Sequence, residues 1–348
     1  MPEKSLPNYE VVPLRKDEIV VAAIQTRAQK VDHKNPKPDI KKRMEHILHL
    51  IDLASTRARA PVDLFCFHEC VVQGMATKLW AREDFIRLAI EMPGEETELL
   101  GKKAKELNAY IEMAAYTKEK DWPGHFFNTS FIVGPNGKVI HNHWKAHVSP
   151  GFETATTVQD VLDRFLERYG WDAVWPVVKT DIGNIATFVC SEGFAPETAR
   201  AFAFKGAEIL VRSCGGCAIS GMAGGVGDPR FTMRAWCMCN DVWGVFANNA
   251  HGQTDHYSVE ASAAGSTMII DNAGKIVQQS ESHNEDIVIA TIPIAYFRKN
   301  HSLPRLRVEI YAPVYAQFTG KYPPNMHSEY LAKDYQDEIE YARRKARW

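Results

Sequence analysis

The stretch IATFVCSEGFAPETARAFAFKGAEILVRS, residues 185–213, places an expected strand, a helix and a second strand in close succession. A run of apolar and β-branched residues ends at Cys190, and polar and helix-forming residues follow it. We expect the helix over 196–206 and the second strand over 208–213. Short apolar strands that alternate with helices are typical of layered α/β folds. Cys190 is therefore either a reactive thiol at a strand tip or one more buried cysteine.

The same alternation extends outward from this stretch. Before it we expect strands at 18–28 and 62–69, helices at 39–58 and 93–108, and a hairpin that turns at 135–137. After it we expect a helix around 229–241, a strand at 243–250 and a hairpin that turns at 272–274. Because both halves run helix, strand, helix, strand and hairpin, the order indicates a core of two sheets with helices outside.

The chain divides into an N-terminal arm (1–17), a main domain (18–295) and a C-terminal extension (296–348). The extension is irregular and rich in Pro, Arg and Tyr, and it ends in a charged helix. We expect it to cover a neighbouring subunit. Within the main domain, residues 154–175 form an amphipathic insertion whose apolar face carries Leu162, Phe165, Leu166 and Tyr169.

The composition is that of an ordinary globular protein, with 348 residues, 45% hydrophobic residues and a net charge of −2. Its two basic clusters, 41–43 and 343–345, lack interleaved aromatic residues, so we expect no nucleic-acid partner. No apolar run approaches the roughly 20 residues of a membrane helix. Seven cysteines without framework spacing, and an N-terminus without an apolar leader, predict reduced thiols and a cytoplasmic location.

Glu69, Lys145 and Cys190 each follow a strand-like run, where α/β folds place their chemistry. A thiolate is a nucleophile, and a nearby ammonium group lowers its pKa and stabilises an oxyanion. A carboxylate can take the thiol proton and return it to a leaving amine. A helix directly after Cys190 would add its N-terminal amides. Sequence spacing alone leaves open whether the three residues converge.

Over roughly residues 18–295 the sequence resembles the nitrilase superfamily of carbon–nitrogen hydrolases, and within it the aliphatic-amidase-like branch. DLFCFHECVVQG looks like the block that carries the family's catalytic glutamate, here Glu69. FNTSFIVGPNGKVIHNHWKAH looks like the lysine block, with Lys145, and VCSEGFAPETARAFAFKGAEILVRS looks like the nucleophile block, with Cys190. The resemblance implies a four-layer αββα sandwich with a C-terminal extension, assembled as a homodimer or a higher homo-oligomer.

The resemblance also implies roles for further residues. Glu153, eight residues beyond Lys145, matches a second glutamate that positions the lysine and the hydrolytic water. The backbone N–H of Ser191 matches an oxyanion donor, and Trp144 is a candidate substrate contact beside Lys145. The expected reaction is hydrolysis of a carboxylic amide to acid plus ammonia or amine through a thioacyl-enzyme on Cys190, with no metal or organic cofactor.

Two related reactions use the same residues. A nitrilase would act on a nitrile, but the Pro-Glu…Arg…Gly-Ala-Glu pattern after Cys190 resembles the amidase and carbamoylase branches instead. An N-carbamoyl amidohydrolase usually carries arginines soon after the cysteine, and the nearest here is Arg200. His68, Cys70 and Ser191 depart from the residues common in amidases. Small side chains in place of rings predict an acyl pocket of different shape.

An alternative hypothesis is that the protein is not an enzyme but a binding or metal protein built around Cys217 and Cys239. The CxxC pair Cys214–Cys217 would need two more ligands for zinc, and Cys237 with Cys239 is the second pair that the sequence offers. The order of elements is not that of a thioredoxin-like redox unit, and no HExxH spacing occurs. We therefore expect no metal, and we expect the glycine-rich segment 215–227 to line the substrate entrance.

Overall fold

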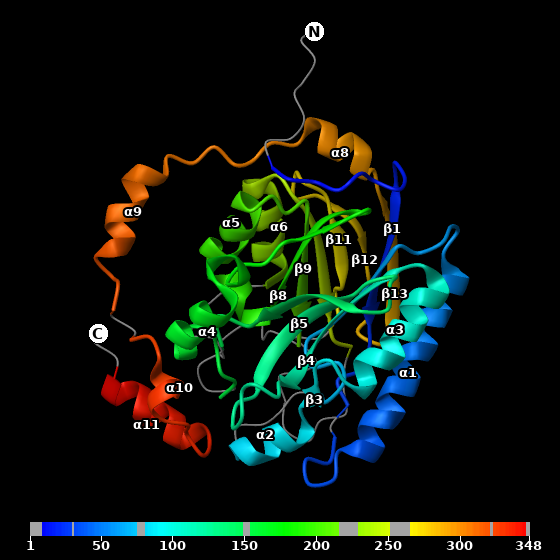
Figure 1. The fold of residues 1–348 in the computed structure, drawn as a ribbon. Coiled ribbons are helices and arrows are strands. Elements are labelled where there is room, and N and C mark those ends of the chain that lie inside the picture. The colour runs from blue at the N-terminus through cyan, green and yellow to red at the C-terminus, as the bar shows by residue number, and fades with distance from the viewer. Residues whose placement is uncertain are drawn as a thin grey trace.

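The computed structural model describes residues 9–29, 31–74, 81–148, 154–215, 229–250, 265–320 and 323–345. Two sheets pack face to face, and helices cover the outer face of each (Figure 1). The expected α/β architecture with two central sheets is confirmed. None of the helices within the described ranges is both long and apolar enough to cross a membrane.

The first sheet has the strand order β13-β1-β2-β4-β5-β6, with the short β3 paired to β4. It contains β1 (Ile19–Gln25), β2 (Leu64–Phe67), β3 (Ile90–Glu91), β4 (Tyr110–Lys118), β5 (Phe127–Val133), β6 (Val139–Trp144) and β13 (Asp286–Ile292). β1, β2 and β4 are parallel, whereas β5 and β6 form the predicted antiparallel hairpin. β13, which the sequence reading did not single out, pairs antiparallel with β1.

The second sheet has the order β12-β11-β10-β9-β8-β7. It contains β7 (Val178–Thr180), β8 (Gly183–Val189), β9 (Ile209–Cys214), β10 (Trp243–Asn248), β11 (Met268–Ile270) and β12 (Ile276–Gln279). β8, β9 and β10 run parallel, so their carboxyl ends meet at one edge. Polar groups at this edge can therefore act together.

Helices α1 (Lys37–Arg57) and α3 (Glu95–Leu107) cover the first sheet, and α5 (Pro196–Phe204) and α6 (Pro229–Asn240) cover the second. Strands β1 and β2 are nearly continuous apolar runs because both of their faces are buried. In β1, Val21 and Ala23 pack between the sheets, whereas Ala22 and Ile24 pack toward α1. This alternation builds the four layers.

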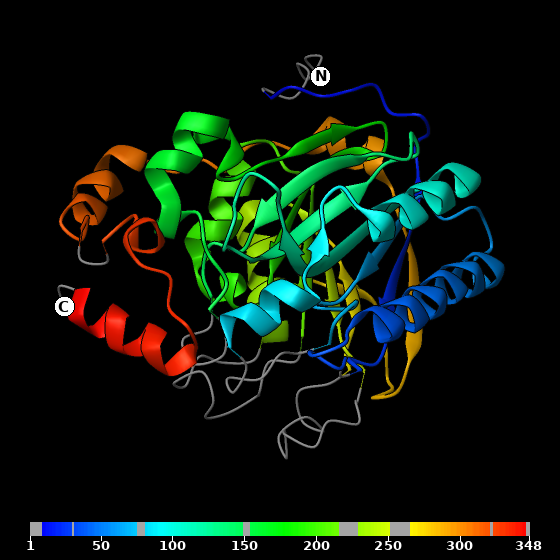
Figure 2. The same ribbon diagram turned by 60° about the horizontal axis from the view of Figure 1, so that its bottom comes forward.

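The insertion and the extension form a separate group of short helices beside the sandwich (Figures 1 and 2). They are α4 (Leu162–Tyr169), α9 (Val308–Ala316), α10 (Met326–Glu329) and α11 (Tyr335–Lys345), whereas α8 (Ile294–Asn300) packs Ile294 and Phe297 into the core between the sheets. α2 (Arg82–Leu88) lies near them, and Arg82 donates to the carbonyl of Ala332 at 2.7 Å. The predicted apolar face of 154–175 is confirmed: Phe165 is buried against Trp122 and Trp144. α9 has no buried residue.

Candidate active site

Glu69, Lys145 and Cys190 lie just past the carboxyl ends of β2, β6 and β8, as their sequence positions predict. All three side chains are buried. The Nζ atom of Lys145 lies 2.7 Å from Oε1 of Glu69. The structure thus brings into contact two residues that are 76 positions apart.

The Glu69 carboxylate receives two further hydrogen bonds. The side-chain amide of Asn128 donates to Oε1 at 2.8 Å, and the backbone N–H of Gly215 donates to Oε2 at 3.0 Å. The backbone of Lys145 also donates to the carbonyl of Asn128 at 2.8 Å, so the β5–β6 hairpin positions both the lysine and the amide. A buried carboxylate needs such donors because burial penalises an unpaired charge.

Cys190 occupies a turn that presents its thiol at the end of β8. Its φ of 44° lies in the left-handed region, which a non-glycine residue adopts at a cost in free energy. The buried Arg212 holds this turn by donating to the Cys190 carbonyl from Nε at 2.9 Å and Nη2 at 2.6 Å. Gly193 leaves room for that guanidinium, because a Cβ there would lie 2.2 Å from Arg212 Cζ.

The end of β9 joins the thiol to the Glu69–Lys145 pair. The Sγ atom of Cys214 lies 3.7 Å from Sγ of Cys190, and the next residue, Gly215, donates its N–H to Glu69. Both groups therefore contact consecutive residues of one strand end. The Cys190 thiol and the Glu69–Lys145 pair therefore lie at the same end of β9.

A second buried carboxylate, Glu192, connects the chain segments of Lys145 and Cys190. Its Oε1 accepts from the N–H of Ala146 at 2.9 Å and lies 2.9 Å from His143 Nε2, while Oε2 accepts from the N–H of Val189 at 2.7 Å. Burial favours a raised pKa for Glu192, but the His143 charge and these hydrogen bonds together lower it below its ordinary value. Glu192 thus fixes the spacing of the two strand ends.

A third buried carboxyl group, Glu112 of β4, lies between the two sheets. Its Oε1 accepts from the Ser130 hydroxyl at 2.8 Å and the Ser213 hydroxyl at 2.6 Å, and Oε2 accepts from the N–H of Phe67 at 3.3 Å. These three contacts are each two positions along the chain from a residue of the site. Phe67 precedes Glu69, Ser130 follows Asn128, and Ser213 precedes Gly215. Burial raises the pKa of Glu112 to about 7, although its hydrogen bonds oppose that rise.

The other residues predicted for the site have different outcomes. The Ser191 hydroxyl donates to the His147 carbonyl at 2.5 Å, which fixes the residue whose N–H we expect in the oxyanion hole. Trp144 is stacked on Phe127 with ring centroids 3.7 Å apart, and its Nε1 donates to Glu119. This packing is toward the insertion, so substrate contact by Trp144 stays a prediction. Glu153 lies outside the described residues.

The helix expected over 196–206 is confirmed as α5, which begins at Pro196. A 3-10 turn, Cys190–Phe194, separates it from the thiol. Proline favours the first position of a helix because its φ is already helical and it has no N–H to satisfy. Helix α5 therefore supplies no amides next to the thiol.

The cysteine pairs considered for zinc do not assemble within the described ranges. Cys214 contacts Cys190, Cys237 is buried in α6, and Cys239 is exposed on it. Burial raises the pKa of the Cys237 thiol, which disfavours the thiolate that a metal needs. No group of three or more His, Cys, Asp or Glu side chains in the described part of the chain is placed to hold a metal ion. Cys217 and most of the segment 215–227 lie outside it.

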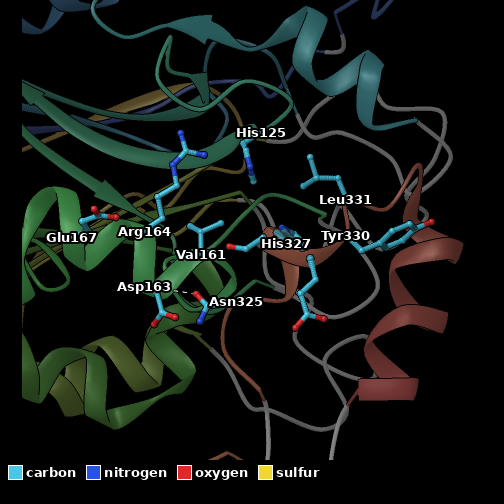
Figure 3. Close-up of a pocket in the computed structure, with 11 residues that line it drawn as sticks. His125, Val161, Asp163, Arg164, Glu167, Asn325, His327, Tyr330 and Leu331 are labelled. Atoms are coloured by element: carbon cyan, nitrogen blue, oxygen red, sulfur yellow. Dashed lines mark hydrogen bonds between the residues drawn. The ribbon is translucent and has the colours of Figure 1, made fainter.

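A hollow of about 830 Å³ lies elsewhere, between the insertion and the C-terminal extension (Figure 3). His125 and His327 lie on its wall, and the backbone N–H of Asp163 donates to Asn325 across its edge at 2.9 Å. Its lining includes none of the residues Glu69, Lys145 and Cys190. The hollow is therefore distinct from the site at the strand ends.

The sequence analysis missed three contacts of the site: Asn128, Glu112 and Arg212. Each is a buried polar residue within a strand of the sandwich. Since burying an unpaired polar group is costly, such a residue is the sequence signal that could have identified them.

Comparison with known proteins finds a family model and relatives that match this chain. A family model described as carbon-nitrogen hydrolase matches residues 20–300. A formamidase of Bacillus cereus (strain B4264) is 30% identical over 184 residues, which are 51% of this chain and 49% of the formamidase. The chain thus spans about half the length of the curated relatives it matches.

Solved structures share the fold. Nit3 of Saccharomyces cerevisiae, described as a member of branch 10 of the nitrilase superfamily, has a TM-score of 0.66 at 19% identity over 86% of this chain and 99% of its own. A carbon-nitrogen hydrolase of Helicobacter pylori G27 has a TM-score of 0.68 at 17% identity, covering 86% and 98%. An amidase of Nesterenkonia sp. AN1 in complex with acrylamide has a TM-score of 0.61 at 15% identity, covering 88% and 100%. These likenesses confirm the predicted sandwich.

Proposed function

Because the chain belongs to the carbon–nitrogen hydrolase family of the nitrilase superfamily, we propose that it hydrolyses a carboxylic amide to an acid plus ammonia or an amine. The observation that carries this proposal is the buried Glu69–Lys145 ion pair, joined to the Cys190 thiol through Cys214 and Gly215. It supplies a nucleophile, a proton carrier and a cation in one place, which is what acyl transfer requires.

In the proposed mechanism, Glu69 takes the proton of the Cys190 thiol as the sulfur attacks the amide carbon. Lys145 and the backbone N–H of Ser191 stabilise the negative oxygen of the tetrahedral intermediate. Glu69 then donates the proton to the leaving nitrogen, the C–N bond breaks, and a thioacyl-enzyme remains. Glu69, assisted by Glu153, activates a water that releases the acid and restores the thiol.

The amide is favoured over the two related substrates by the known proteins that the chain resembles. A formamidase is among the curated relatives and is 30% identical over 184 residues, and an amidase with bound acrylamide shares the fold. The sequence pattern after Cys190 also supports an amide, since it matches the amidase and carbamoylase branches better than that of the nitrilases. A nitrile or an N-carbamoyl compound remains the alternative substrate.

A substrate panel tests the proposed reaction. Aliphatic amides of increasing acyl size, the matching nitriles, and N-carbamoyl amino acids are incubated with the wild type and with Cys190→Ala. We expect acid and ammonia in equal amounts from at least one amide, and no turnover in Cys190→Ala. Turnover confined to nitriles or carbamoyl compounds would replace the amide, and full activity of Cys190→Ala would overturn the thiol mechanism.

We also propose that the chain forms a homodimer or a higher homo-oligomer. Helix α9 presents large apolar side chains to solvent, including Ile310 and Val314, which are four residues apart and share one face. Exposed apolar stripes of this kind are typical of subunit contacts.

The six cysteines within the described ranges are all thiols, which supports the proposal of a cytoplasmic location.

A further inference from the structure

The Cys190 thiol has a second thiol as its neighbour. Its Sγ lies 3.7 Å from Sγ of Cys214, and the Cys214 side chain is fully buried. The two residues are the next positions after Val189 and Ser213, which pair in the parallel ladder of β8 and β9. The contact is thus fixed by the register of two central strands and is independent of any loop.

This arrangement suits a disulfide. Neighbouring strands lie about 4.8 Å apart, which falls within the Cα separation of about 4.4–6.8 Å that disulfides span. The two sulfurs already touch, so rotation about the side-chain bonds can bring them to the S–S bond length of about 2 Å. A bond formed here would occupy the sulfur that the proposed hydrolysis uses.

We propose that Cys190 and Cys214 form a site of reversible oxidative modification, at which hydrogen peroxide converts the two thiols into a disulfide. In the first step the Cys190 sulfur attacks one peroxide oxygen, the O–O bond breaks, and hydroxide leaves and takes up a proton to become water. Cys190 then carries a sulfenic acid. In the second step the Cys214 sulfur attacks Cys190, its proton goes to the departing hydroxyl, and a second water leaves as the S–S bond forms.

The two cysteines differ in the way that these steps require. Cys190 is 7% exposed and Cys214 is fully buried, so peroxide reaches the Cys190 sulfur first. Cys214 is shielded from solvent, so peroxide does not reach it directly. Its sulfur lies 3.7 Å from Cys190, which is therefore the oxidised group that it can attack. Burial raises the pKa of the Cys66 and Cys237 thiols, which disfavours their direct oxidation.

The consequence is a protected, inactive form of the enzyme. A sulfenic acid that stays exposed to peroxide is oxidised further to sulfinic and sulfonic acids, which thiols do not reduce. Capture by Cys214 stops this at the disulfide, and a dithiol reductant restores both thiols. The inference rests on the proposed function, because it uses Cys190 as the reactive thiolate of the hydrolysis.

The test compares the full-length wild type with Cys214→Ser and with Cys239→Ser, whose cysteine is exposed on α6 and serves as the matched control. Each protein receives the same excess of hydrogen peroxide, is alkylated, and is mapped as non-reduced peptides by mass spectrometry. Amide hydrolysis is measured before and after dithiothreitol. Wild type and Cys239→Ser should show a Cys190–Cys214 cross-link and lose most of their activity, and dithiothreitol should restore it.

Cys214→Ser should instead carry added oxygen atoms on Cys190 and stay inactive after dithiothreitol. A cross-link from Cys190 to Cys217, or the same recovery in Cys214→Ser as in the wild type, would overturn the inference. The cross-link is read by mass and needs no turnover. If it forms in a protein that hydrolyses no amide, the proposed function fails while the modification stands. If amide hydrolysis depends on Cys190 and no cross-link forms, the inference fails alone.

Discussion

Lys145 Nζ and Glu69 Oε1 lie 2.7 Å apart, and each side chain is only 1% exposed. At such burial neither charge can be hydrated by bulk water, so each stabilises the other. Asn128 and Gly215 donate to the same carboxylate and fix its orientation. The pair is therefore both a structural element and the proposed source of the proton transfers.

Removing one partner of this pair should cost more than removing both charges. Lys145→Met leaves the Glu69 carboxylate buried without its cation, and we expect a loss of about 3–5 kcal/mol in the free energy of unfolding. Adding Glu69→Gln should restore most of that loss. Denaturant unfolding of the two single variants and the double variant measures the coupling.

The double variant should regain stability relative to Lys145→Met but should not regain activity. Lys145→Met and the double variant lack the cation, and Glu69→Gln lacks the proton carrier, so each should lose at least a factor of about 10²–10⁴ in kcat. A double variant as active as the wild type would show that the ion pair is only structural.

Asn128 should matter through the orientation of Glu69. Asn128→Ala removes the donor at 2.8 Å, and displacement of a catalytic group by about 1 Å costs roughly a hundredfold in rate. We expect that loss in kcat with a smaller change in KM, measured on the best amide. The exposed Asn142 of β6 is the matched control, and Asn142→Ala should keep wild-type kinetics. Equal effects of both variants would argue against the orienting role.

Glu112 predicts a dependence of stability on pH. Its pKa is about 7 in the folded protein against the ordinary 4.5, so the folded state keeps a proton that the unfolded chain has lost between these values. The contribution of the protonated Glu112 to the free energy of unfolding is complete below about pH 4.5 and is lost as the pH rises through about 7. The difference between the two pKa values corresponds to roughly 3 kcal/mol.

Glu112→Gln cannot lose a proton, so its melting temperature relative to the wild type should rise between pH 5 and pH 8. The melting temperatures of both proteins across this range provide the measurement. Glu98→Gln, at an exposed position of α3, should keep the wild-type pH profile. A constant difference between Glu112→Gln and the wild type would contradict the shifted pKa of Glu112.

The apolar face of α9 predicts a dependence of assembly on this helix. Ile310→Asp combined with Val314→Asp places two charges on that face, and we expect a smaller oligomer than the wild type because charges disfavour burial in a contact. Light scattering after size-exclusion chromatography gives the mass. Glu309→Gln, exposed on the same helix, should assemble as the wild type does. Unchanged mass in the double variant would place the contact elsewhere.

The sequence predicted the positions of Glu69, Lys145 and Cys190 at strand ends because apolar runs end where the sheet meets solvent. It could not predict their convergence, since separations of 76 and 45 residues carry no information about distance, and the family resemblance supplied that step. Asn128 was missed because the polar run Asn128-Thr129-Ser130 does not show which of its side chains contacts Glu69. β13 was missed because most of its residues are only half-buried, which weakens the periodic signal.

The thioacyl-enzyme on Cys190 is the central claim, and its direct test is the intact mass of the protein during turnover. Glu153→Gln is mixed with the best amide, quenched in acid and mapped by peptide mass spectrometry, because loss of the proposed deacylation partner should slow release of the acid. We predict one added acyl group, located on Cys190 and absent in Glu153→Gln combined with Cys190→Ala. An enzyme that hydrolyses the amide while Cys190 stays unmodified at every quench time, and that keeps its activity in Cys190→Ala, would contradict the mechanism.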